Sequence, residues 1–93
     1  MLRERLTPDR IRRFTCPADA KQSFLWDTDA PRLAVRATAG AKSFIFEAKL
    51  NRQTIRVTIG DVKAWNLDDA RTEARRLQTL VDQGTDPRQE KAE

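Results

Sequence analysis

Two runs of alternating apolar and polar residues flank the dipeptide Asn51-Arg52 in residues 41–60. A two-residue connection between such runs predicts a β-hairpin. Pairing Leu50 with Gln53 puts the apolar positions on one face: Phe44, Phe46, Ala48, Ile55, Val57 and Ile59. The other face is mainly polar: Ile45, Glu47, Lys49, Thr54, Arg56 and Thr58. This register sets Phe44 opposite Ile59 and Glu47 opposite Arg56, and a slip of one residue would mix the two faces.

Two further runs predict strands before the hairpin. Residues 23–27 form a short aromatic-rich strand, and turn-forming residues follow it. Residues 33–38 predict the next strand, with apolar side chains at alternate positions. If residues 39–42 form the loop to the hairpin, Val35 lies beside Phe46 and the apolar face continues across three strands.

An amphipathic helix is predicted for residues 66–83. Asn66 is a good N-cap and Gly84 supplies a C-cap. Apolar residues recur along it at spacings of three and four: Leu67, Ala70, Ala74, Leu77, Leu80 and Val81. This stripe is the expected cover for the apolar sheet face. The predicted fold class is α+β: a small three-stranded antiparallel β-sheet, with a short N-terminal strand, packed on one face by a C-terminal α-helix.

Residues 1–22 predict an N-terminal arm with one short helix, which Thr7 can cap and in which Pro8 suits the first position. Its arginines lie outside the side that carries the apolar residues: Arg10, Arg12 and Arg13. A solvated helix face and a phosphate contact both account for them, and both interpretations stay open. Residues 23–84 form the predicted domain, and the polar residues 85–93 fit the start of a linker.

Composition narrows the class of protein. The chain has 93 residues, of which 39% are hydrophobic and 34% charged, as expected for one small soluble domain. Neither an apolar run long enough for a membrane span nor a signal peptide is visible, so a cytoplasmic location is expected. With one cysteine, no histidine and no tyrosine, we expect no metal site, no cofactor and no catalytic site.

The charge is uneven along the chain. Of the formal net charge of +4, residues 1–60 carry +6 and residues 61–93 carry −2. A polyanion would therefore be attracted to the sheet and the N-terminal arm. Since a two-stranded ribbon fits the major groove of DNA, the polar sheet face supplies base-reading candidates: Arg36, Lys49, Thr54, Arg56 and Thr58. Neighbouring cations are phosphate-binding candidates: Arg10, Arg12, Arg13, Lys42 and Arg52.

The polar sheet face is not specific to DNA binding. Alternating threonine and charged residues are typical of any solvent-exposed sheet, so a protein-binding module fits this face as well as DNA does. Arg71 and Arg75 share one side of the predicted helix, and we interpret them first as a solvated face. Glu47 opposite Arg56 either forms an ion pair that neutralises the face or accepts a hydrogen bond from a base amino group.

Several short segments together resemble a known family. They are the Asp27-to-Leu33 turn, Lys42-Ser43-Phe44, Ile59-Gly60, Leu67-Asp68-Asp69-Ala70-Arg71 and Gly84-Thr85-Asp86-Pro87. In order and spacing they are similar to the N-terminal domain of phage and genomic-island integrases of the tyrosine recombinase superfamily. The resemblance implies a three-stranded antiparallel sheet backed by a helix, which binds double-stranded DNA at arm-type sites away from the crossover. It also implies that the catalytic Arg, His and Tyr lie in a separate C-terminal domain.

The hypothesis from the sequence is thus an arm-site DNA-binding domain of a tyrosine-type integrase that supports integration and excision of a prophage or genomic island. Residues 85–93 would begin the linker to its core-binding and catalytic domains. The expected partners are duplex DNA and other integrase protomers, without a membrane or a small-molecule substrate. The competing hypothesis is a protein-interaction module that couples integrase protomers or an accessory factor.

Overall fold

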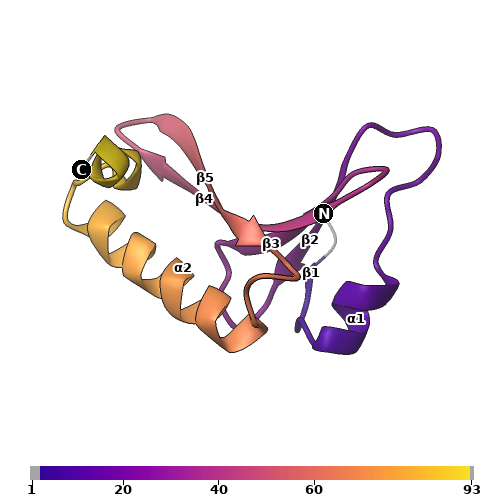
Figure 1. Ribbon diagram of the computed structural model, residues 1–93. Coiled ribbons are helices and arrows are strands. Elements are labelled where there is room, and N and C mark those ends of the chain that lie inside the picture. Colours follow the sequence, from indigo (N-terminus) through magenta and orange to yellow (C-terminus); the bar gives the residue numbers. More distant parts are fainter. Residues whose placement is uncertain (1–2, 93) are drawn as a thin grey trace.

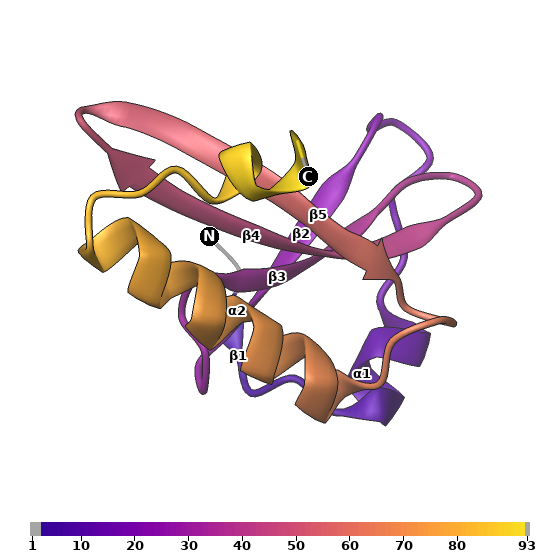
Figure 2. The same cartoon turned by 60° about the vertical axis from the view of Figure 1, so that its left-hand side comes forward.

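A five-stranded mixed sheet forms one layer of the molecule, and helices cover one of its faces (Figure 1 and Figure 2). The computed structural model describes residues 3–92, so residues 1, 2 and 93 at the ends of the predicted segments 1–22 and 85–93 lie outside the described part. The strands follow chain order: β1 (Arg3–Glu4), β2 (Ser23–Asp27), β3 (Leu33–Ala37), β4 (Lys42–Leu50) and β5 (Gln53–Asp61). The helices are α1 (Pro8–Arg13), α2 (Leu67–Asp82) and the 3-10 helix η1 (Pro87–Ala92).

The predicted α+β class is confirmed. Strands β2 to β5 pair antiparallel, as expected, while β1 adds a parallel edge strand beside β2 that the sequence did not predict. Strand β1 is only two residues long, which is too short for an alternating pattern, so the sequence could not indicate it. Helix α2 runs diagonally under the sheet, and α1 lies at the opposite end of the molecule from the tip of the β4–β5 hairpin (Figure 1).

The β4–β5 hairpin keeps its predicted register from Ile45↔Thr58 to Leu50↔Gln53. Asn51 and Arg52 both have positive φ, 52° and 68°, as the central residues of a type I′ turn require. Beyond Ile45 a bulge shifts the pairing, so that Phe44 lies opposite Gly60 and its predicted pairing with Ile59 is wrong. The shift sets Gly60 against the Trp65 indole, where a Cβ would lie 2.3 Å from Nε1.

The predicted register between β3 and β4 is also wrong, by two residues. Val35 pairs with Phe44 rather than Phe46, and Ala37 pairs with Lys42. The reason is a tight turn at residues 38–41, in which the Thr38 amide donates to the Ala41 carbonyl over 2.9 Å. Because side chains alternate with a period of two, this shift leaves every residue on its predicted face.

The core lies between the sheet and α2. It includes residues from four strands, α2 and the N-terminal segment: Leu6, Ile11, Leu25, Leu33, Val35, Phe44, Phe46, Ala48, Ile55, Val57, Ala70, Ala74 and Leu77. Each large side chain contributes about 1.5 to 3 kcal/mol on burial, so docking of α2 stabilises the sheet. Both predicted helix ends are confirmed: the Asn66 side chain accepts from the Asp69 amide over 2.8 Å, and Gly84 has a φ of 84°.

One helix arginine is part of the interior. Arg71 is only 6% exposed, so its interpretation as a solvated residue is wrong, whereas Arg75 is exposed. Its Nε donates to Asp27 Oδ2 over 2.8 Å, and its Nη2 donates to Asp27 Oδ1 over 3.1 Å and to the Leu6 carbonyl over 2.8 Å. Asp27 is completely buried and also accepts from the amides of Leu6 and Ala30. This ion pair joins α2, β2 and the N-terminal segment.

Candidate nucleic-acid interface

The sheet face directed away from α2 is hereafter called the outward face. Strand alternation opposite to the buried core positions places these residues of β2 to β5 on it, among others: Phe24, Trp26, Ala34, Arg36, Ile45, Glu47, Lys49, Thr54, Arg56 and Thr58. The five base-reading candidates of the sequence are all in this set. The sheet therefore brings them onto one surface, on the side away from α2 (Figure 1).

An aromatic pair lies on the β2 part of the outward face. The rings of Phe24 and Trp26 stack with centroids 6.2 Å apart and planes at 23°. Trp26 pairs with Ala34 of β3, and Ala34 pairs in turn with Ile45 of β4. Both Ala34 and Ile45 are completely buried. We attribute that burial to the two rings, since the three residues form one row across the sheet. The sequence analysis missed this patch, although the alternation in residues 23–27 could have indicated it.

Arg56 is held from two sides on this face. Its Nε and Nη2 both donate to Oε2 of Glu47, over 2.9 and 2.5 Å. Its guanidinium carbon lies 5.0 Å from the centroid of the Phe24 ring, a cation–π contact. The predicted pairing of Glu47 with Arg56 is confirmed, and the Arg56 side chain is still 40% exposed. The geometry leaves a fixed, accessible guanidinium above the sheet.

The other candidates on the outward face are less constrained. Lys49 and Thr54 form a pair near the hairpin tip and are exposed, and Thr58 is exposed opposite Ile45. Arg36 is half-buried on β3, next to Phe24 on β2. Within residues 3–89 the Lys49 ammonium makes no hydrogen bond or ion pair, so it is available to an anion.

The phosphate candidates divide between two places. Arg52 is exposed in the hairpin turn, close to Lys49. The three arginines of α1 are at the far end of the molecule (Figure 1). Two of these, Arg12 and Arg13, form ion pairs with Asp9, and Arg10 donates to the carbonyl of Arg5 over 2.6 Å. The structure does not bring α1 onto the outward face.

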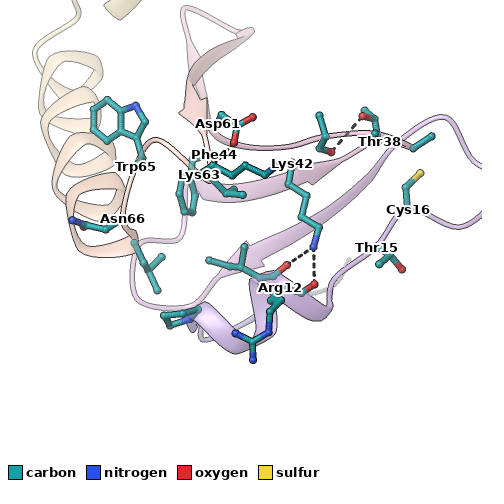
Figure 3. Close-up of a pocket in the computed structure, with 17 residues that line it drawn as sticks. Arg12, Thr15, Cys16, Thr38, Lys42, Phe44, Asp61, Lys63, Trp65 and Asn66 are labelled. Carbon is teal, nitrogen blue, oxygen red and sulfur yellow. Dashed lines mark hydrogen bonds between the residues drawn. The ribbon is translucent and has the colours of Figure 1, made fainter.

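Lys42 points to the opposite side of the sheet. Its Nζ donates to the carbonyl oxygens of Ile11 and Arg12, over 2.8 Å each (Figure 3). A cation at the C-terminal end of a helix satisfies carbonyls that lack partners within the helix. The structure thus places Lys42, a predicted phosphate-binding residue, as a cap on α1 and away from the base-reading candidates.

Two comparisons with known proteins identify the family of this chain. Residues 6–93 fit the family described as "Arm DNA-binding domain". The chain belongs to this family. It is also similar to the prophage integrase IntF of Escherichia coli (strain K12), with 56% identity over 90 residues. The alignment covers 97% of this arm DNA-binding domain and 19% of that relative, so the chain spans about a fifth of its length. The integrase resemblance drawn from the sequence is confirmed.

The arm DNA-binding domain also has a groove remote from the outward face. A cavity of about 620 Å³ lies where α1, the turn between β3 and β4, and the connector from β5 to α2 meet. Phe44, Trp65 and Lys42 line it, with Arg12 and Lys63 among the charged residues around it (Figure 3). Across the described residues, no three potential metal ligands gather, and no helix is both long and apolar enough to cross a membrane.

Proposed function

We propose that this arm DNA-binding domain is the module of a tyrosine-type integrase that binds arm-type sites on duplex DNA through its outward face. The observation that carries the proposal is the shared surface of Arg36, Lys49 and Arg56, flanked by Thr54 and Thr58 and open to solvent. Arginine, lysine and threonine are residue types that reach base edges and phosphates.

The shape of the hairpin supports a major-groove contact. The last pair between β3 and β4 is Leu33↔Phe46, so the hairpin extends past β3 from Glu47 to Arg56. This two-stranded projection carries Lys49, Arg52 and Arg56 without a neighbouring strand on the β4 side. The major groove of B-DNA is about 12 Å wide and admits a two-stranded ribbon. We therefore assign base contacts to the projecting half of the hairpin.

Phosphate contacts would come from the edges of this surface. Arg52 in the turn would meet one strand of the duplex. The α1 arginines Arg10, Arg12 and Arg13 would meet phosphates only where the DNA continues past the sheet. Lys42 has no place in this set, because its ammonium is bound to α1 carbonyls.

Catalysis by the parent protein would take place in another domain. We infer that strand cleavage and joining belong to a catalytic domain beyond the arm DNA-binding domain, in a cytoplasmic protein that integrates and excises a prophage or genomic island. In that arrangement this domain holds a distant DNA site and contributes no catalytic residue. Residues 85–93 would lead towards the other domains, and contacts with further protomers would be made in the assembled complex.

The test is a salt-dependent binding titration with duplexes from the arms of the element's attachment site. The double variant Lys49→Ala/Arg56→Ala is compared with Lys63→Ala/Arg75→Ala, which removes the same charges from exposed residues off the outward face. We expect the first variant to lose affinity and to lower the slope of log K against log salt by about 0.9 for each lost phosphate contact. Equal behaviour of the two variants would show that the outward face is not the DNA site.

Size-exclusion chromatography at high protein concentration tests the competing protein-interaction function. Assembly that rises with concentration, together with no binding to any duplex, would favour that function over the proposal.

A further inference from the structure

We propose that Arg56 recognises one guanine, and that Glu47 and Phe24 are the positioning residues that orient its guanidinium before DNA binds and give it this selectivity. The inference rests on the proposed function, because it requires DNA on the outward face. It concerns which base is recognised and how, which neither the fold nor the family determines.

The hydrogen bonds of the guanidinium decide which of its edges is presented. Nε and Nη2 lie on the same side of the group, and both donate to Oε2 of Glu47. The end of the group formed by Nη1 and the second N–H of Nη2 has no acceptor among the described residues. Two parallel N–H donors at that end match the O6 and N7 acceptors that guanine shows in the major groove.

The Phe24 ring fixes the plane of the same guanidinium. With the group 5.0 Å from the ring centroid on one side and bound to Glu47 at one edge, rotation of the Arg56 side chain is restricted before DNA arrives. A side chain that is already ordered loses less conformational entropy on binding. Lys49 has no such support and makes a suitable comparison, since its ammonium can follow any nearby phosphate.

The Glu47 carboxylate also acts against unspecific binding. It neutralises Arg56 on the outward face, so the pair attracts phosphates less than a free arginine would. A carboxylate close to phosphates or base acceptors is repelled when the duplex is out of register. Glu47 is thus expected to lower affinity for unselected DNA while it raises the preference for the correct base.

The experiment starts with the 93-residue chain and a duplex library of random sequence, from which bound DNA is enriched and sequenced. Each guanine of the enriched duplex is then replaced singly by 7-deazaguanine, which removes N7 and keeps the Watson–Crick pair. Binding is measured by fluorescence anisotropy for the wild type and for Arg56→Ala, Arg56→Lys, Glu47→Ala, Phe24→Leu and Lys49→Ala. Circular dichroism confirms that each variant is folded.

At one guanine we expect the wild type and Lys49→Ala to lose about tenfold in affinity on replacement by 7-deazaguanine, as for a bidentate contact. Both Arg56 variants should show no such loss, although Arg56→Lys keeps the charge. Glu47→Ala should bind unselected duplex more tightly than the wild type and discriminate less at that guanine. Phe24→Leu should discriminate less without the gain in affinity.

Other outcomes separate the two proposals. Suppose that the wild type selects DNA and that Lys49→Ala/Arg56→Ala weakens binding, but that Arg56 affects discrimination at no guanine. Recognition of a guanine by Arg56 is then wrong, and the outward face remains the DNA site. If Glu47→Ala keeps the full discrimination, Glu47 is not a positioning residue. If the double variant selects and binds DNA as the wild type does, the proposed function and this inference both fail.

Discussion

Replacing Arg71 with alanine should remove a large share of the domain's unfolding free energy. The substitution removes three hydrogen bonds and leaves the carboxylate of Asp27, which is completely buried, without its cation. Breaking a buried pair in this way costs about 3 to 5 kcal/mol. A 93-residue domain has a total unfolding free energy of roughly 5 to 14 kcal/mol at 0.05 to 0.15 kcal/mol per residue. One side chain thus accounts for a large share of the stability.

Urea unfolding followed by the fluorescence of Trp26 and Trp65 measures this loss. With a slope of about 1.5 kcal/mol per molar urea, the midpoint should fall by about 2 to 3 M. Arg75→Ala is the matched control, because it removes an exposed arginine one turn further along α2 and should shift the midpoint by less than about 0.3 M. The reasoning would be refuted if Arg71→Ala and Arg75→Ala shifted the midpoint equally.

Three further perturbations follow from the structure. Burial alone would raise the pKa of Asp27, but hydrogen bonds from Arg71 and backbone amides bring this pKa below its usual value. The stabilisation is therefore complete above about pH 4 and is lost as the pH falls towards the lowered pKa. Between pH 5 and pH 2, the unfolding free energy measured with urea should fall more for the wild type than for Asp27→Asn. Gly60→Ala sets a Cβ 2.3 Å from the Trp65 indole and should cost about 1 to 3 kcal/mol in thermal unfolding, whereas Gly40→Ala, which meets nothing within 4 Å, should not. Arg52→Gly relieves a positive φ of 68°, which costs a non-glycine residue about 1 to 2 kcal/mol, and adds about 0.4 to 1 kcal/mol of unfolded-state entropy. The net stabilisation should be about 0.5 to 1 kcal/mol, with weaker DNA binding, and a lower melting temperature would contradict this.

The hairpin shows how far periodicity can predict a fold. Its register was predictable because a slip of one residue would have exposed the apolar face, and Asn51-Arg52 fixed the turn. The bulge near Phe44, which is accompanied by the close approach of Gly60 to Trp65, is not contained in the alternation of either strand. The register between β3 and β4 could not be predicted for another reason. A shift of two residues keeps every side chain on the same face, so the apolar pattern fits both registers equally well.

The outward face was predictable in its membership but not in its internal contacts. Alternation alone assigned Arg36, Lys49 and Arg56 to one face. The position of Phe24 under Arg56 depends on how β2 and β5 approach each other across a twisted sheet, which no local pattern specifies. The orientation of Lys42 towards α1 similarly required the three-dimensional position of that helix.

Arg71 shows the limit of a helical pattern. Its spacing from Arg75 suggested a charged solvent side, yet it adjoins Ala70 and Ala74 of the apolar stripe. A carboxylate far away in the sequence, Asp27, makes its burial favourable. Sequence periodicity could therefore place the edge of the buried surface near Arg71. It could not identify Asp27 as the partner that makes burial of Arg71 favourable.

The same ion pair imposes an order of events on a growing polypeptide. Asp27 and the Leu6 carbonyl precede their partner Arg71 by 44 and 65 residues, so both are synthesised long before it. At about 5 to 20 residues per second, the 44-residue interval lasts roughly 2 to 9 s. Strands β3 to β5 are synthesised within that interval, and β5 is complete only at Asp61. Strands that pair before α2 follows have an apolar face with no helix to cover it. Arrival of α2 is thus the step that closes the fold, and until then the nascent chain presents a surface that chaperones and proteases recognise.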